Sequence, residues 1–202
     1  MKKITLTLFA YTFLLTITIG CKGEKKSTTD PDTKVEEEIV KETVSKEEKE
    51  IEATMLEIVL SPKSKSKVSG TVTFTGEGEM VTMTAKLEGL TAGAHAIHIH
   101  EKADCSSDDG KSTGGHWNPT MEPHGKWGAT EGYHKGDIGN FSADADGKGS
   151  ITFATNDWCI GCGDEKKDII GKAIIVHQGT DDYTSQPSGA AGSRISCGGI
   201  IQ

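Results

Sequence analysis

The sequence predicts an all-β domain, and three observations support that fold class. The apolar segments are short and are separated by Gly, Asp, Asn and Ser, as in chains built of short strands. Several segments alternate apolar and polar residues with a period of two, which is typical of antiparallel strands with one buried face. Glycine is abundant, at 25 residues, and aromatic residues make up only 5% of the chain, so a helical domain is disfavoured.

The first 20 residues predict a signal peptide. Two lysines precede an apolar run from Leu6 to Gly20, which is too short for a comfortable membrane span. The run ends at Cys21 in TIGC, which predicts a lipoprotein, although Thr18 stands where a larger aliphatic residue is more usual. An ordinary signal peptide with an unmodified cysteine is the alternative. We expect an exported protein, periplasmic or in the cell envelope, that is anchored to the membrane through Cys21.

Residues 21–52 predict a charged, flexible tether between the anchor and the domain. This segment consists mainly of Lys, Glu, Thr, Ser and Asp, and cannot bury enough apolar surface to offset the entropy lost on ordering. The whole chain carries a net charge of −8, to which the leader contributes +2 and the tether −4, so residues 53–202 carry −6. This negative net charge argues against nucleic acid as a partner.

From about residue 54 the domain predicts six strands, separated by two long irregular stretches. In chain order the strands are MLEIVL (55–60), KVSGTVTFTG (67–76), MVTMTAKLEGL (80–90), AHAIHIHE (94–101), GSITFAT (149–155) and KAIIVHQ (172–178). The irregular stretches run from 102 to about 140 and from 179 to 192. Loops this long in a compact domain are usually functional, and these two hold or adjoin histidines.

The fourth strand, HAIHIHE, contains three of the seven histidines of the chain. Successive side chains of a strand point to opposite faces, so His98 and His100 share one face. Ile97 and Ile99 share the other face, and His95 points with the isoleucines. The pattern therefore places two imidazoles side by side on a rigid strand, which is a common beginning of a metal site.

The remaining histidines indicate that this metal site is larger. His116, His124 and His134 lie in the first irregular stretch, His177 ends the last predicted strand, and Asp137 follows His134 by three residues. Imidazoles with a carboxylate suit Cu(II) and Zn(II) better than Ca²⁺ or Mg²⁺. One four-coordinate ion would leave histidines over, so the sequence predicts two ions. Solvated loop histidines are the alternative, which the His-x-His strand disfavours.

Five cysteines in an exported chain predict disulfides. With Cys21 lipidated, four cysteines remain, and the sequence alone allows three ways of pairing them. The four are Cys105, Cys159, Cys162 and Cys197.

Five segments, in this order, carry a resemblance to a known family. HAIHIHEKADCSS, GGHWNP, HKGDIGN, AIIVH and GSRISCGGI resemble the copper/zinc superoxide dismutases of the exported bacterial type, over residues 53–202. The resemblance implies a Greek-key β-sandwich, or flattened barrel, of eight antiparallel strands with two long functional loops. It implies an antioxidant oxidoreductase that converts superoxide to dioxygen and hydrogen peroxide by alternate reduction and oxidation of a histidine-bound copper. A zinc ion would share one bridging histidine with the copper.

The resemblance also assigns the candidate ligands. The implied copper ligands are His98, His100, His116 and His177, and the implied zinc ligands are His116, His124, His134 and Asp137. His116 would be the shared imidazolate and would take up a proton during turnover, which makes it catalytic. His95 would be a hydrogen-bonded structural residue, in agreement with its opposite position in the strand.

Further assignments concern the substrate and the loops. Arg194 is the only arginine of the chain, beside 21 lysines, and would dock the superoxide anion near copper. Asp181 would link a copper-ligand histidine to a zinc-ligand histidine and fix their orientation. The disulfide implied by the family joins Cys105 to Cys197 and would tie the first loop to the segment of Arg194. The resemblance leaves a homodimer open.

Cys159 and Cys162 depart from the family pattern. A Cys-x-x-Cys segment is typical of a redox pair or of a soft-metal site, but no βαβ pattern of the thioredoxin kind surrounds it. In an oxidising compartment a local structural disulfide is favoured.

Two other functions compete with the enzyme. A non-catalytic protein of the same fold could sequester or deliver copper, but such relatives typically lose some ligands or the arginine, and this chain keeps all of them. A structural β-sandwich anchored in the envelope would not explain two ordered ligand sets. The sequence therefore favours the dismutase.

Overall fold

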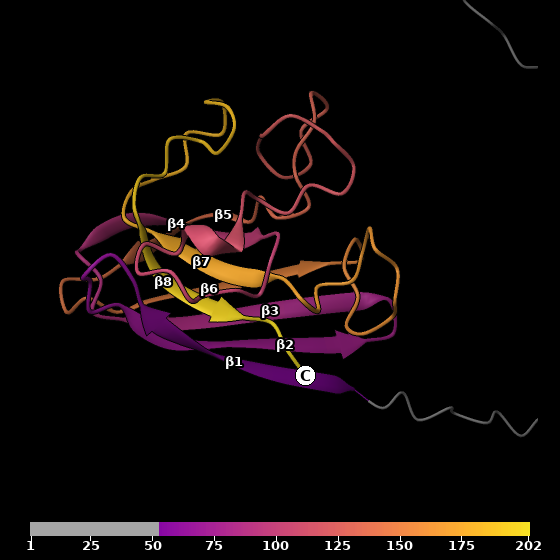
Figure 1. Cartoon of the computed structure of the whole chain (residues 1–202), viewed down its shortest axis with the longest axis horizontal. Helices are drawn as coiled ribbons and strands as arrows, with labels where there is room; N and C mark the ends of the chain where they lie inside the picture. Colours follow the sequence, from indigo (N-terminus) through magenta and orange to yellow (C-terminus); the bar gives the residue numbers. More distant parts are fainter. Residues whose placement is uncertain (1–52) are drawn as a thin grey trace, which may run out of the picture. The chain divides into compact units, whose positions relative to one another are not determined.

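The computed structural model describes residues 53–202, which form an all-β domain of eight strands (Figure 1). The fold class predicted from the sequence is confirmed. The strands are β1 (Thr54–Pro62), β2 (Ser69–Glu77), β3 (Met80–Glu88), β4 (Gly93–His100), β5 (Gly139–Ala143), β6 (Gly149–Thr155), β7 (Ala173–His177) and β8 (Arg194–Gly199). A single 3₁₀ turn, η1 (Lys111–Thr113), lies between β4 and β5.

The strands form one closed antiparallel barrel with Greek-key connections. Their order around the barrel is β1-β2-β3-β6-β5-β4-β7-β8. Because β3 pairs with β6 while β4 pairs with β5 and β7, the chain crosses over between β3 and β4 instead of continuing to the next neighbour. Two residue pairs, Ser61 with Cys197 and Pro62 with Ser196, join β1 to β8 and close the barrel.

The six strands expected from periodicity are all present, and two more strands lie where no pattern was visible. The first irregular stretch, expected to run from 102 to about 140, ends at residue 138, because β5 begins at Gly139. The second missed strand, β8, contains Gly198 and Gly199. A side chain at Gly198 would collide with Leu60, whose Cδ2 atom lies 2.5 Å from the position of a Cβ. β5 alternates buried and less buried residues but has only five residues. β8 lacks alternation, because its four central residues are all buried.

The barrel interior is filled by aliphatic side chains and a few aromatic ones. Its fully buried members include Phe74, Met83, Ile97, Ile99, Trp158, Ile169, Ile174 and Ile200. The core thus draws on nearly every strand, and the barrel is a rigid support for residues on its outer face.

Both long loops rise from the same side of the barrel, over β4 and β7 (Figure 1). The first loop is fastened to β4 by backbone hydrogen bonds. The amide of Trp117 donates to the carbonyl of Ile99, and the amide of Ile99 donates to the carbonyl of Gly136. Gly136 has no room for a side chain, because a Cβ would lie 2.1 Å from the Ile99 oxygen. The loop residues on either side of these bonds are therefore held against the strand.

The predicted signal peptide (1–20) and tether (21–52), with Cys21, lie outside the described residues. Among residues 53–202, no helix is long and apolar enough to cross a membrane.

Candidate metal centre

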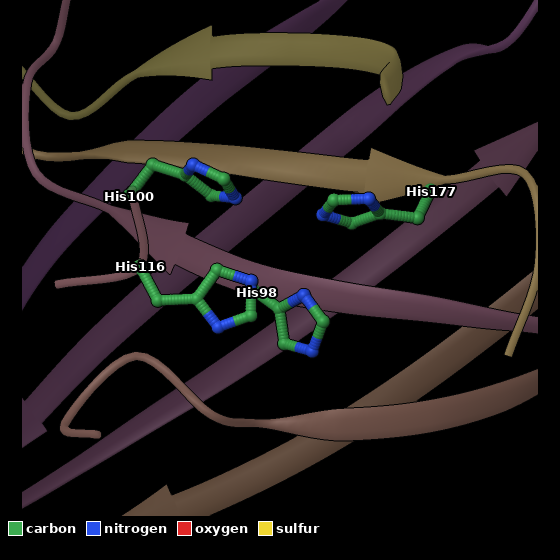
Figure 2. A group of neighbouring side chains, drawn as sticks. All are labelled: His98, His100, His116 and His177. Carbon is green, nitrogen blue, oxygen red and sulfur yellow. The ribbon is translucent and has the colours of Figure 1, made fainter. Parts of the chain in front are cut away.

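β4 presents two histidines on the outer face of the barrel. Ile97 and Ile99 are fully buried in the core, whereas His98 and His100 point together toward the loops (Figure 2). The strand alternation predicted this division. Both imidazoles are nonetheless buried, because the loops cover them.

A third histidine comes from the end of β7. Val176 is buried in the core and the next residue, His177, lies on the outer face. The pairing of β7 with β8 shifts register between these two residues, so that His177 pairs with Arg194. Irregularities of this kind redirect side chains next to functional sites. Here the shift places a histidine and the arginine of the chain opposite each other.

The first loop adds a fourth histidine. His116 forms an isolated antiparallel bridge with His100 and directly precedes Trp117, whose amide is bonded to β4. The ring of His116 lies 4.0 Å from the ring of His98 and 5.0 Å from the ring of His100, measured between centroids. The structure therefore brings together four histidines from positions up to 79 residues apart in the chain.

These four histidines form the first cluster, and each offers a free nitrogen to its centre (Figure 2). One nitrogen of each ring lies within 4.8 Å of one nitrogen of every other ring. Within residues 53–202, these buried nitrogens have no hydrogen-bond partner: His98 Nδ1, His100 Nε2, His116 Nε2 and His177 Nε2. A buried polar atom without a partner is costly. Four converging ones fit a bound metal ion.

The opposite nitrogen of each ring is occupied, which fixes how the ring is oriented. His100 Nδ1 lies 3.1 Å from the carbonyl oxygen of Gly114, and His177 Nδ1 lies 3.3 Å from that of Gly192. His98 Nε2 contacts the Asp181 carboxylate at 2.9 Å. With the proton on the bonded nitrogen, the other nitrogen of each ring is left as an electron-pair donor.

The second cluster shares His116 with the first and surrounds Asp137. One carboxylate oxygen of Asp137 lies 2.7 Å from His116 Nδ1 and 3.1 Å from His134 Nδ1. The other oxygen lies 3.0 Å from His124 Nδ1, although not in hydrogen-bonding geometry. Three nitrogens and a carboxylate within 4.8 Å of one another are a donor set that suits tetrahedral zinc.

The two clusters differ in charge when no ion is bound. Burial, with some repulsion between the rings, holds the pKa of His100 and of His177 well below the usual value. Burial also lowers the pKa of His116 to about 4, against the opposing effect of Asp137. These three rings are therefore neutral at physiological pH, as metal ligation requires.

In the second cluster, the negative charge of the Asp137 carboxylate governs the protonation of its neighbours. Burial would lower the pKa of His124, but the adjacent Asp137 and Asp181 carboxylates outweigh it and raise that pKa to about 9. Burial would likewise raise the pKa of Asp137, yet hydrogen bonds with His116 and His134, together with the His124 ring beside it, hold that pKa well below its usual range. Without an ion, a proton on His124 partly balances the buried carboxylates. A cation bound there would displace that proton.

Asp181 connects the two clusters. Its Oδ2 atom contacts His98 Nε2 and its Oδ1 atom contacts His124 Nε2, both at 2.9 Å. Sequence analysis assigned it this linking position. Two partners of Asp181 were not foreseen. The Asn140 amide group donates to the Asp181 carbonyl and accepts its backbone N–H, each at 2.8 Å, and Gly189 leaves room for the carboxylate. No pattern in the sequence marks either residue.

Arg194 is anchored beside the first cluster. Its Nη1 atom donates to the carbonyl of Gly110 at 2.9 Å and to the Thr113 hydroxyl at 3.0 Å. Both partners belong to the first loop, which a disulfide between Cys105 and Cys197 joins to β8 three residues after Arg194. The guanidinium is half-buried, so it remains accessible to a small anion.

His95 takes no part in either cluster. It is buried, with Nδ1 at 3.0 Å from the carbonyl of His177 and Nε2 at 2.8 Å from that of Thr91. Its ring packs near Phe141. Both nitrogens are used within the fold, and one of them holds the backbone of a cluster histidine.

Cavity size does not mark the metal centre. A surface groove of about 720 Å³ lies over β2, β3 and the β5–β6 turn, where neither histidine cluster contributes a residue. The histidines are instead enclosed under the loops. Their site is identified by its donor atoms.

Comparisons with known proteins agree with these features. A family model described as copper/zinc superoxide dismutase matches residues 68–200. An extracellular superoxide dismutase [Cu-Zn] of Caenorhabditis elegans is 33% identical over 144 residues, which cover 68% of this chain. The chain spans 63% of the length of that relative.

Solved structures are similar as well. The crystal structure of a SOD-like protein from Bacillus subtilis has a TM-score of 0.63 at 30% identity, over 72% of this chain and 97% of that one. A double mutant of the same protein has a TM-score of 0.64 at 31% identity, with the same coverage.

Proposed function

Because this chain belongs to the copper/zinc superoxide dismutase family, we propose that it converts superoxide into dioxygen and hydrogen peroxide. The observation that carries the proposal is the pair of buried donor sets that share His116, with an anchored arginine beside one of them. Redox turnover needs a metal that changes its charge next to an anion-binding group. The two clusters and Arg194 supply that combination.

We assign copper to the first cluster, with His98, His100, His116 and His177 as ligands. The four unpartnered nitrogens of this cluster support the assignment, since imidazole donors suit copper. Bound there, copper would supply the one-electron redox chemistry. The chain contributes the geometry, because hydrogen bonds at the opposite nitrogens hold three of these rings in place.

We assign zinc to the second cluster, with His116, His124, His134 and Asp137 as ligands. Zinc has no redox chemistry of its own. Its role would be to order the first loop and to hold His116 Nδ1, so that His116 Nε2 faces the copper side. Asp181 keeps His98 and His124 oriented, and this support commonly contributes to metal affinity.

Arg194 and His116 have distinct tasks in the proposed reaction. The positively charged guanidinium docks superoxide, which compensates for the −6 charge of the domain through a local field at the site. In the half of the cycle in which His116 Nε2 does not ligate copper, that nitrogen would hold a proton taken from solvent and would give it to the departing peroxide. Solvent would supply the second proton. Arg194 stays fixed during turnover because Gly110 and Thr113 hold its guanidinium, and zinc would hold His116 at Nδ1.

Export is supported by the two disulfides of the domain and by the extracellular relative. Beyond that, we propose that residues 1–20 are a signal peptide and that Cys21 carries a lipid anchor in the periplasm or cell envelope. Residues 21–52 would tether the catalytic domain, 53–202, to the membrane. Metabolic labelling with a fatty acid tests this, with Cys21→Ser as the variant that should lose the label. A label retained by the variant would refute the anchor.

Superoxide dismutation by the purified chain, with copper and zinc quantified in the same sample, tests the activity. We expect rapid turnover at one copper and one zinc per chain. Arg194→Ala should lower the rate by about 10- to 100-fold, the contribution of a charge-assisted hydrogen bond, with unchanged metal content. Lys148→Ala is the control, because it removes the same charge from an exposed turn.

Full metal content with negligible turnover would refute the enzyme and favour copper sequestration. Equal rates for Arg194→Ala and Lys148→Ala would refute the role of the arginine while leaving the activity in place.

A further inference from the structure

The Cys159–Cys162 segment forms a third group of potential metal ligands. The two sulfur atoms and a carboxylate oxygen of Asp168 lie within 4.8 Å of one another. The group shares no residue with the histidine clusters. In the structure the two cysteines are joined by a disulfide, so the sulfur atoms are not available as ligands in this state.

The segment keeps its shape by means other than the disulfide. The amide of Cys159 donates to the carbonyl of Lys167, and the amide of Ile169 donates to the carbonyl of Cys159. The Asp168 carboxylate accepts the backbone N–H groups of Gly161 and Gly163 at 2.9 and 2.8 Å. These bonds close the loop from both ends, so opening the disulfide would leave both sulfurs near the carboxylate.

The disulfide itself stabilises the fold little. It joins residues only three apart, whereas Cys105 and Cys197 are 92 apart. The entropy that a crosslink removes from the unfolded chain grows with the length of the closed loop. A crosslink this short is therefore a weak explanation for two cysteines at these positions.

The two disulfides also differ in their exposure to a reductant. Cys162 is exposed and Cys159 is half-buried, whereas in the other disulfide Cys105 is half-buried and Cys197 is 1% exposed. Thiol–disulfide exchange requires direct attack on a sulfur atom, so access controls its rate. A dithiol reductant would reach Cys162 first and leave the other crosslink intact.

We propose that Cys159, Cys162 and Asp168 form a third, redox-controlled metal site, which takes Zn²⁺ once a dithiol has reduced the disulfide. The S–S bond breaks when the dithiol transfers two electrons and two protons to Cys159 and Cys162. The two cysteines become thiols, and the dithiol becomes a disulfide. Binding then releases both thiol protons. Two thiolates and one carboxylate are a donor set that zinc accepts, with solvent as the fourth ligand.

An ion can reach this site from solvent. Asp168 and Gly163 line a surface groove of about 630 Å³, together with Glu101 and Lys172. The groove opens on the side of the segment that carries the carboxylate. Zinc would therefore bind without displacement of the barrel strands.

Cobalt provides a probe, because a thiolate bound to Co²⁺ gives a sulfur-to-metal charge-transfer absorption that histidine sites lack. The chain, loaded with copper and zinc, is treated anaerobically with a dithiol, freed of it, and titrated with Co²⁺. Alkylation and peptide mass spectrometry identify which cysteines have been reduced. The double variant Cys159→Ser/Cys162→Ser and the untreated chain are the controls.

We expect free thiols at Cys159 and Cys162 alone, one additional equivalent of cobalt, and a charge-transfer band that Zn²⁺ abolishes by competition. Neither control should show the band. Free thiols without additional cobalt or a band would overturn the proposal. So would a Cys159–Cys162 disulfide that resists a dithiol as strongly as Cys105–Cys197 does. These results do not depend on superoxide turnover.

Discussion

Around Asp181, five contacts converge on a single residue. Its carboxylate orients His98 and His124, its backbone is clamped by Asn140, and its Oδ1 atom also accepts the amide of Tyr183 at 2.7 Å. Because the carboxylate contacts both imidazole rings, it cannot move without changing the orientation of a proposed ligand. At the scale of one residue, the metal centre therefore depends on groups that never touch a metal.

Gly189 provides a test of that dependence. A Cβ added there would lie 1.8 Å from Asp181 Oδ1 and 2.7 Å from His124 Nε2. Gly189→Ala should push the carboxylate away from His124 and weaken zinc binding by about 10- to 100-fold, as is usual when a ligand loses its supporting partner. Competition with a zinc chelator measures the affinity.

Gly78→Ala is the matched control for Gly189→Ala. Gly78 has φ of +60°, against +64° at Gly189, and nothing lies within 4 Å of its Cβ position. Both variants carry the same backbone strain, so only the collision differs. Equal zinc affinity in the two variants would contradict the supporting role of Asp181.

The candidate ligands and Asp181 could be predicted from the sequence, whereas the residues that hold Asp181 in place could not. His-x-His on a strand and the spacing of His134 and Asp137 are local patterns that one element can carry. Asn140 and Gly189 matter because the second loop folds over the end of β5. That contact joins segments about 50 residues apart, and no local pattern encodes it.

At the scale of elements, the first loop is coupled to β8. The Cys105–Cys197 disulfide and the bonds of Arg194 to Gly110 and Thr113 both connect them. The crosslink and the arginine lie on the same strand, three residues apart. Loss of the crosslink should therefore affect both stability and the position of Arg194.

The double variant Cys105→Ser/Cys197→Ser should lower the free energy of unfolding by about 2–5 kcal/mol, because it frees a long loop in the unfolded chain. The double variant Cys159→Ser/Cys162→Ser opens a crosslink between residues only three apart, so it should lower the free energy of unfolding distinctly less. Denaturant unfolding of the metal-free variants measures both. Equal losses would show that the loop-length argument fails here.

The elements themselves were predictable where their side chains alternate. β2 and β3 alternate buried and less buried residues along their length, and both were expected. β5 and β8 were not, because β5 is only five residues long and begins at Gly139, and β8 has four consecutive buried residues and ends in Gly198 and Gly199. Glycine in a strand marks a close approach by another segment. The sequence therefore shows the glycines of these strands but not the neighbouring segments that require them.

At the scale of the whole molecule, the buried histidines make the stability of the metal-free chain depend on pH in two directions. His100, His116 and His177 have lowered pKa values in the folded state, that of His116 being about 4. The unfolded chain, with histidine pKa near 6.5, binds more protons than the folded chain below pH 6.5. The free energy of unfolding should therefore fall as the pH falls from 6.5 toward 4.

The opposite holds for His124, whose pKa is raised to about 9 by Asp137 and Asp181 once the opposing effect of burial is overcome. Its stabilising contribution is fully present below pH 6.5 and is lost as the pH rises through 9. The lowered pKa values of Asp137 and Asp181 add to the loss of stability below about pH 5, where the carboxyls of the unfolded chain begin to bind protons, and have no effect at higher pH. The metal-free chain should thus be most stable near pH 6.5.

Thermal unfolding of the metal-free chain at pH 4.5, 6.5 and 9 tests this maximum. His124→Gln should flatten the alkaline side and leave the acid side, because it removes only the group whose pKa is raised. Bound zinc should also flatten the alkaline side, since a metal ligand carries no proton to lose. A melting temperature that rises steadily from pH 4.5 to 9 would contradict the balance of charge inferred for the second cluster. The rise in stability above pH 6.5 would then have to come from groups outside the metal centre.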